Sequence, residues 1–249
     1  MDSIRKLILG LYPTTKLILF CFIVLSMLLV QNLIFSYLLV PLCLAIAMLG
    51  GKGKPFLNLF MKALLPIALM IFLLQIFFYP GATILWSWGI FSITQEGIMF
   101  SLTLISRLLT IGAAFLLFFQ ITSIKDFIYS LEKRGLPPKA AYVIFSTFQI
   151  IPEIKNISST IMDAQRARGV ETEGNILVRA KAFFPTLAPL FLTSISSTEE
   201  RAMALEARAF TVKGSKTRLY QLEKTAMDLF VRIVLLLLLL MIIGWRYFL

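Results

Sequence analysis

Long runs without a charged residue set the main constraint on this chain. No charge occurs between residues 17 and 51. That length suits two membrane-spanning helices of roughly 17–20 residues each, with Gln31 and Asn32 as the turn between them. A second uncharged run covers 63–95 and is interrupted at Tyr79-Pro80-Gly81, so it supplies one span that ends near Phe78. With further spans over about 98–121 and 229–246, the pattern predicts an all-α integral membrane protein with about five transmembrane helices.

Composition and charge placement agree with insertion in a membrane and give it a direction. The chain is 59% hydrophobic and its mean hydropathy is +0.88, which is too apolar for an ordinary soluble domain. Arg5 and Lys6 precede the first span as in a signal peptide, but no small-residue cleavage pattern follows. Lys52 and Lys54 follow the second span, and the positive-inside rule places them in the cytoplasm. The N-terminus is therefore expected inside, and five spans put the C-terminus outside.

The region between the fourth and last spans has a different composition. Residues 125–224 carry 25 of the 37 charged residues of the chain. Within this region, 140–151 and 182–195 are nonetheless strongly apolar, and their lengths suit interfacial helices better than spans. We expect a four-helix membrane region over 1–123, a cytoplasmic and interfacial region over 124–225 whose helices are half embedded, and a C-terminal membrane helix over 226–249.

A short pattern occurs twice in this polar region, at a spacing of forty residues. Ala164, Ala167 and Arg168 of the first copy correspond to Ala204, Ala207 and Arg208 of the second. Two Ala-rich amphipathic helices could share these letters by chance. The alternative is a repeated docking tip, because an Arg between small residues offers an unshielded guanidinium to a partner's carboxylates. The residues of interest are Ala167, Arg168 and Gly169 in the first tip, Ala207, Arg208 and Ala209 in the second, and Gln165 and Glu206 beside them.

Each tip ends an expected helix, which we call an arm. The first arm begins at Pro138, shows apolar residues every three or four positions and stops at Gly169. Pro152 should bend it, because proline removes the backbone bond to residue 148. The second arm is expected to begin near Pro185 or Pro189.

Three charged residues in or beside the spans need a structural explanation. Arg107 is the one charge of the fourth span. An intramembrane Arg suggests a functional site by default, but here we favour hydrogen bonds to neighbouring helices inside the bundle. Asp228 and Arg232 lie at the inner end of the last span, four residues apart, a spacing at which opposite charges interact on a helix.

Several function classes are disfavoured by what the sequence lacks. Histidine is absent, and the only cysteines, Cys21 and Cys43, lie in apolar runs, so His-based catalysis, metal ligation and disulfides are not expected. The Gly/Lys-rich stretches at 51–54 and 214–217 lack the spacing of a phosphate-binding loop, so the chain should not hydrolyse ATP itself. Cytoplasmic topology and anionic lipid headgroups explain the net charge of +11 better than nucleic-acid binding.

The chain resembles the transmembrane T-component of energy-coupling factor (ECF) transporters, the EcfT/CbiQ family, over nearly its whole length. The strongest part is Asp163-Ala164-Gln165-Arg166-Ala167-Arg168-Gly169, the family's Ala-Arg-Gly tip. In the second tip Ala209 stands where Gly is commoner, and in the opening motif Tyr12 stands where Asp is usual. The other matching segments are Leu11-Tyr12-Pro13-Thr14-Thr15-Lys16-Leu17, Thr122-Ser123, Ser130-Leu131-Glu132, Gly135-Leu136-Pro137 and Ile151-Pro152.

The resemblance implies a multi-pass subunit of a prokaryotic plasma membrane that has no cofactor of its own. It implies that each tip docks on one of two cytoplasmic ATP-binding-cassette subunits, which bind the ATP, and that the membrane helices and arms hold a substrate-binding S-component. The cargo would be a vitamin or a transition-metal ion.

Two other function classes remain open from the residues alone. A conventional ABC permease would form the substrate path itself, but the spans offer no polar site beyond Arg107. An intramembrane enzyme would need convergent ionisable groups, which the spans lack.

Overall fold

A computed structural model describes all residues except 1, 31, 89–90, 171–174, 213–221 and 249. The chain forms two compact units. The first, here called the bundle, comprises Met1–Arg134 and Leu222–Leu249, and the second, the arm pair, comprises Gly135–Gln221. The chain thus leaves the bundle to form the arm pair and returns to it for the last helix.

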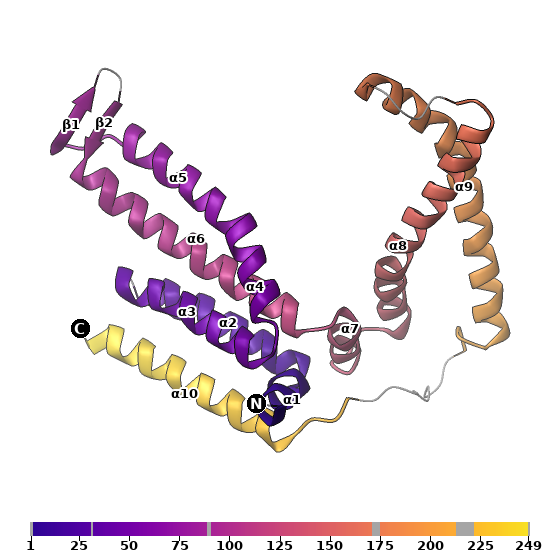
Figure 1. The fold of residues 1–249 in the computed structure, drawn as a ribbon. Coiled ribbons are helices and arrows are strands. Elements are labelled where there is room, and N and C mark those ends of the chain that lie inside the picture. Colours follow the sequence, from indigo (N-terminus) through magenta and orange to yellow (C-terminus); the bar gives the residue numbers. More distant parts are fainter. Residues whose placement is uncertain (1, 31, 89–90, 171–174, 213–221, 249) are drawn as a thin grey trace. The chain divides into compact units, whose positions relative to one another are not determined.

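The bundle is built from helices and one small hairpin (Figure 1). Three helical runs are long and apolar enough to cross a membrane, namely Gly53–Phe78, Gln95–Ile121 and Ala226–Arg246, and two shorter apolar helices, Pro13–Leu29 and Leu33–Leu49, accompany them. The all-α membrane fold is thereby confirmed. The elements are α1 (Asp2–Gly10), α2 (Pro13–Leu29), α3 (Leu33–Leu49), α4 (Gly53–Leu59), a π-helical turn (Phe60–Leu64), α5 (Leu65–Phe78), β1 (Ile84–Trp88), β2 (Phe91–Thr94), α6 (Gln95–Ile121), α7 (Ile124–Glu132) and α10 (Ala226–Phe248).

Helix α6 lies at the centre of the bundle and packs against α2, α3 and α5. Small buried residues, among them Ala113, Ala114 and Ala47, let the helices approach closely. The Thr110 hydroxyl donates to the carbonyl oxygen of Ser36 on α3 at 2.8 Å, so a buried polar group links two spans. Van der Waals packing and interhelical hydrogen bonds therefore hold the centre, as expected where lipid gives no hydrophobic driving force between helices.

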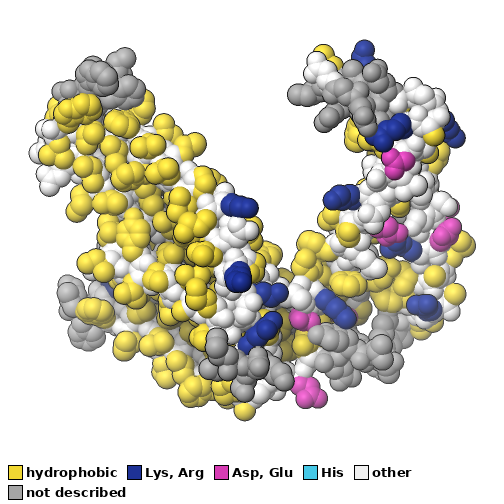
Figure 2. Space-filling model, in the orientation of Figure 1, with side chains coloured by type: hydrophobic (Ala, Val, Ile, Leu, Met, Phe, Trp, Pro, Cys, Tyr) yellow, Lys and Arg dark blue, Asp and Glu magenta, His cyan; other side chains and the backbone are white. Residues whose placement is uncertain are grey.

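The outer faces of the same helices are apolar and exposed. Leu38 on α3, Leu69 on α5 and Leu237 on α10 are 54–61% exposed. Figure 2 shows hydrophobic side chains covering the visible face of α5 and α6. In water such a surface would drive aggregation, and it is the surface expected of a protein that lies in lipid or against another membrane protein.

Two span boundaries differ from those expected. The third span begins at Gly53 rather than near 63, because the helix continues through Lys54 and Lys62 before it becomes purely apolar. A π-helical turn over Phe60–Leu64 precedes Pro66, which lacks the N–H of a regular helix. The fourth span begins at Gln95 rather than near 98, so Gly97 belongs to its first turn and not to the loop that follows Tyr79-Pro80-Gly81. The remainder of that loop forms the antiparallel β1–β2 hairpin.

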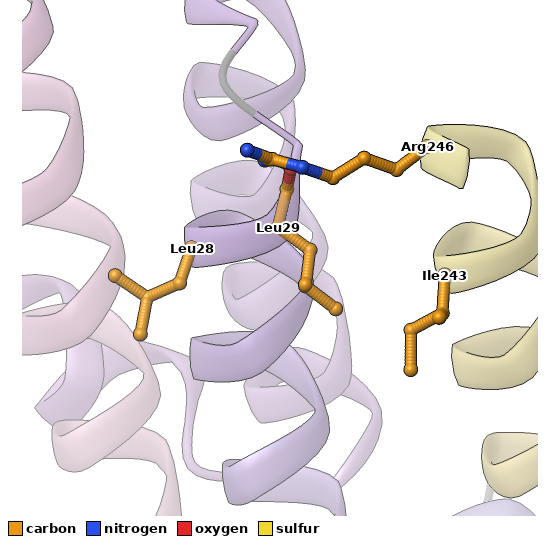
Figure 3. Close-up of a pocket in the computed structure, with 4 residues that line it drawn as sticks. All are labelled: Leu28, Leu29, Ile243 and Arg246. Atoms are coloured by element: carbon orange, nitrogen blue, oxygen red, sulfur yellow. The ribbon is translucent and has the colours of Figure 1, made fainter. Parts of the chain in front are cut away.

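Helices α2 and α10 run in parallel and are tied together at both ends. At the C-terminal ends, Arg246 donates to the carbonyl oxygen of Leu29, the last residue of α2 (Figure 3). This carbonyl has no intrahelical partner, so the guanidinium acts as its cap. Together with Leu28 and Ile243, these two residues line a shallow cavity between the helix ends. The ties at the N-terminal ends involve buried charges and are described below.

The arm pair consists of α8 (Pro138–Ala167) and α9 (Ile176–Ala207). α8 matches the expected first arm and continues through Pro152; whether a bend there aims the tip stays a prediction. The expected start of the second arm is wrong, because α9 begins at Ile176 and contains both Pro185 and Pro189 in its interior. Proline usually ends a helix because it leaves a carbonyl without a donor. A contact from α8 removes part of this penalty here, as shown below.

Candidate functional site

Both arms end in the same hydrogen-bonded cap. In α8, the N–H of Gly169 donates to the Arg166 carbonyl and that of Val170 to the Gln165 carbonyl, both at 3.0 Å. In α9, the N–H of Ala209 donates to the Glu206 carbonyl at 2.9 Å and that of Phe210 to the Leu205 carbonyl at 3.0 Å. This pair of bonds defines a Schellman motif, which satisfies carbonyls at a helix end. The sequence repeat is thus also a repeat of backbone structure.

The residue after each tip arginine has a left-handed backbone. Gly169 has φ +87° and Ala209 has φ +56°. Ala209 is the one non-glycine residue with positive φ among those described. This conformation costs an alanine roughly 1–2 kcal/mol, because its Cβ approaches the carbonyl oxygen. The second tip therefore keeps the geometry of the first despite an unfavourable residue.

We predict that Ala209→Gly stabilises the second tip by about 1 kcal/mol. Glycine removes the steric penalty of the left-handed backbone, and the greater conformational entropy that it gives to the unfolded chain cancels only part of this gain. Hydrogen exchange at the Phe210 amide should slow accordingly. The reciprocal change Gly169→Ala should speed exchange at Val170. Unchanged exchange in both variants would mean that the left-handed residue does not limit the stability of the tip.

The two tip arginines are exposed at the ends of their helices. Arg168 and Arg208 each follow the last helical residue, and within the described part of the chain neither forms an ion pair. Arg166, one residue from the first tip, has a partner in Asp163 at 3.7 Å. The tips differ at the corresponding position of the second copy, where Glu206 replaces Arg166. Each tip thus presents one uncommitted guanidinium among small residues.

The two tips lie at opposite ends of the arm pair, because α8 and α9 are antiparallel. Phe210, just after the second tip, contacts Tyr142 near the start of α8, with ring centroids 5.3 Å apart. Near the other end, Gln165 bonds to Pro185. From Tyr142 to Arg168, α8 extends for roughly 40 Å at about 1.5 Å per residue. That separation is large enough for each tip to meet a different protein subunit.

Gln165 of the first tip motif helps α9 to tolerate Pro189. Pro189 lacks an N–H, so the carbonyl of Pro185 one turn earlier has no helical donor. The Gln165 side-chain amide donates to that carbonyl at 3.2 Å. A residue of the first tip thus binds the backbone of the second arm at the point where proline leaves an acceptor free.

An ion pair joins the two arms near the middle of α8. Arg201 of α9 donates to the carboxylate of Glu153, and both side chains are partly exposed. The hydrogen bond to Glu153 raises the pKa of Arg201 above its already high ordinary value, so the guanidinium stays charged throughout the physiological pH range. With the Gln165 bond and the Tyr142–Phe210 contact, it fixes the register of the arms.

The arms still expose large apolar faces. Ala141 is the one residue of α8 that is classed as buried among those described. The exposed large hydrophobic side chains are Val143, Ile144, Phe145, Phe148, Ile151 and Ile154 on α8, and Leu177, Phe183, Phe184, Phe191, Leu192, Ile195 and Met203 on α9. Such a surface requires a membrane or a partner protein to cover it.

Sequence reasoning missed the polar junction at the inner end of the bundle. Asp228, 2% exposed, accepts from the N–H of Tyr12 at 2.8 Å and from that of Thr225 at 3.0 Å. Arg232 donates to the hydroxyls of Thr14 and Thr15, each at 2.8 Å. The expected Asp228–Arg232 interaction is therefore wrong, since each side chain has partners elsewhere. The one local signal for it was Thr225 three residues before Asp228, the spacing of a capping box.

Lys16 completes this junction from the opening motif. Its ammonium group donates to the carbonyl oxygens of Leu9 and Ile121, both at 2.8 Å, and the residue is 3% exposed. Ile121 is the last residue of α6, so Lys16 caps that helix. Tyr12 joins through its backbone, while its ring lies under the Lys224 ammonium at 5.7 Å. A Tyr in place of the usual Asp is tolerated because the contact with Asp228 requires only the backbone N–H.

Arg107 does not lie where we expected it. Its side chain is exposed on α6, whereas an Arg that bonds to neighbouring helices inside the bundle would be buried. The helices that pack on α6 cover the other faces, which carry Ser106, Thr110 and Ala113. A guanidinium at the centre of a span costs about 2.5–3.5 kcal/mol on insertion scales, so its exposure needs a reason outside the bundle.

Residues 5–220 match the family described as cobalt transport protein, CbiQ. The chain belongs to the CbiQ family. Relatives named energy-coupling factor transporter transmembrane protein EcfT resemble this CbiQ-family chain over most of its length. The EcfT of Ruminiclostridium cellulolyticum is 32% identical over 231 residues, which cover 88% of this chain and 85% of the relative. The EcfT of Brevibacillus brevis is 29% identical over 249 residues, covering 94% and 92%. The EcfT/CbiQ resemblance of the sequence motifs is confirmed, and the chain is a transmembrane subunit of the transporter type.

Proposed function

We propose that this CbiQ-family chain couples ATP hydrolysis in two partner subunits to uptake through a third. In this proposal, each arm tip docks on one of two cytoplasmic ABC-type ATPases, and a substrate-binding S-component lies against the bundle and the apolar faces of the arms. The cargo would be a vitamin or a transition-metal ion. The observation that carries the proposal is the pair of identically capped tips, each with an exposed arginine, at opposite ends of one antiparallel arm pair.

The arm pair has the connections needed to transmit movement between the docks. A displacement of one tip acts on a helix that is bonded to the other arm at Glu153 and Gln165. The arms would therefore move together when the two ATPases close. Their apolar faces would carry this movement to the S-component, which would tilt or be released to deliver its substrate.

The chain itself would be non-catalytic, without a cofactor, and ATP would be bound by its partners. In the prokaryotic plasma membrane, the proposed orientation places the N-terminus, α7 and the arms in the cytoplasm. In the bundle, the N-terminus and the C-terminus lie at opposite ends of α2 and α10, as this orientation requires.

The composition of the purified assembly tests the proposal against a conventional permease. We expect the tagged chain to co-purify with two ATPase subunits and one small, different membrane protein, because one arm pair offers two docks. A permease would instead purify as two copies of this chain with two ATPases. Native mass spectrometry of the solubilised assembly gives the stoichiometry, and a homodimer without a third membrane protein would contradict the coupling role.

A further inference from the structure

Arg107 lies at the middle of its span, far from both membrane surfaces. Helix α6 runs from Gln95 to Ile121, so Arg107 is one residue from its midpoint. At about 1.5 Å per residue, roughly 18 Å of helix separate it from Gln95 and roughly 21 Å from Ile121. A long charged side chain near a helix end can extend along the helix to place its charge at the membrane surface. From the middle of the span, the Arg107 guanidinium cannot reach either headgroup layer.

The surface around Arg107 is an exposed apolar stripe along α6. Residues spaced four apart are neighbours on a helix and form a ridge that winds slowly around it. Met99 is 60% exposed, Ile111 40%, Phe115 52% and Phe119 55%, and Arg107 lies on the same ridge, next to the half-buried Thr103. The stripe is therefore a mostly apolar ridge, and another membrane helix can pack against the part of it around Arg107.

The spans of this chain supply no carboxylate for Arg107. Their only acidic residues are Glu96 and Asp228, each in the first turn of its helix. Both already accept hydrogen bonds, Glu96 from Thr83 and Asp228 from Tyr12 and Thr225. A second copy of the chain would bring the same spans and again no carboxylate at this depth. Lipid phosphates lie at the membrane surface, so a different membrane protein is the remaining source.

We propose that the Arg107 stripe is a docking surface for a transmembrane helix of the substrate-binding membrane subunit, and that Arg107 pairs with a carboxylate in the middle of that helix. This inference rests on the proposed coupling function, which supplies the partner. A planar guanidinium binds a carboxylate through two parallel hydrogen bonds. Within the membrane such a pair fixes depth and rotation of the docked helix, while the apolar side chains on either side of Arg107 pack against it.

The test is retention of the membrane subunit by assemblies purified through a tagged ATPase. Arg107→Leu should lower the amount of membrane subunit per chain by at least about tenfold, because the partner's carboxylate is left unpaired. ATPase retention should not change, since the tips are unaltered, and leucine favours insertion of α6, so misinsertion cannot explain the loss. Arg107→Lys should retain much more subunit than Arg107→Gln, which lacks the charge. Ile111→Leu, on the same stripe, is the matched control and should bind normally.

A charge exchange identifies the partner residue. The retained subunit should contain an Asp or Glu within one of its spans, and replacing it by Leu should reproduce the loss. Exchanging the two charges, with Arg107→Glu and Arg at the partner position, should restore binding. Normal retention of the subunit by Arg107→Leu would overturn the docking surface, and normal retention by Arg107→Gln would overturn the carboxylate. If no ATPase co-purifies with the wild-type chain, that result contradicts the proposed coupling function and is distinct from a failure of the docking surface alone.

Discussion

Replacing both Arg168 and Arg208 by alanine should release both ATPase subunits from the purified assembly. Each arginine is exposed at an identically capped helix end and has no ion pair within the described chain. If each fits a groove and pairs there with carboxylates, truncation leaves a buried charge unpaired and should weaken that dock by about 2–5 kcal/mol. Each single variant should therefore weaken one dock, and uptake should become uncoupled from hydrolysis.

Three comparisons distinguish specific docking by the tip arginines from a general effect of lost positive charge. Arg→Lys at either tip should rescue only partly, because the two-pronged guanidinium is lost. Lys155→Ala removes an exposed cation from the middle of α8 and should leave both docks intact. Retention of the membrane subunit should survive in all variants, because it uses other surfaces. If the double alanine variant keeps both ATPases at normal stoichiometry and transports normally, both tips are ordinary solvated helix ends.

The spans could be predicted from the sequence because lipid imposes a local rule. A helix of fixed rise must cross a fixed apolar thickness, so an uncharged run shows where a span lies. The same rule locates helix ends poorly. Gly53 and Gln95 begin helices several residues before the apolar runs do, because a helix can extend into water beyond the hydrocarbon.

The tips could also be predicted, because a helix cap depends on neighbouring residues. Gly169 is a typical stop residue, and the repeated letters correctly placed a second stop at Ala209. The start of α9 could not be inferred in this way. Pro185 and Pro189 suggest a helix start, and the amide that binds the carbonyl left free by Pro189 belongs to Gln165, distant in sequence and on the other arm.

The polar partners of Asp228 and Arg232 could not be predicted either, because they are distant in sequence. Four-residue spacing predicts that Asp228 and Arg232 interact, because it describes one isolated helix. In the folded bundle, the N–H of Tyr12, just before α2, binds Asp228, and the hydroxyls of Thr14 and Thr15 on α2 bind Arg232. For Arg107 we predicted partners inside the bundle, but its side chain is exposed. This could not be predicted without knowing which faces of α6 the other helices cover.

The second large effect is expected at Asp228, where Asp228→Ala should destabilise the bundle by about 3–5 kcal/mol. The variant deprives the N–H groups of Tyr12 and Thr225 of a buried, charged acceptor, and each such bond contributes about 1.5–3 kcal/mol. Asp228→Asn keeps one acceptor oxygen and should lie between. Glu223→Ala removes an exposed acidic residue five positions earlier and should have little effect.

Cys43 provides the measurement, because it is fully buried in the core of the bundle while the only other cysteine, Cys21, is exposed. In a Cys21→Ser background, reaction of Cys43 with a thiol dye during heating reports when the bundle opens. Asp228→Ala should lower that temperature, and Arg232→Met should lower it independently, since the two side chains hold different partners. The double variant should then lose clearly more than either single variant, and the departure from additivity measures any direct coupling between the two side chains. Losses far smaller than additive would mean that Asp228 and Arg232 act as one pair after all, as their spacing along α10 suggests.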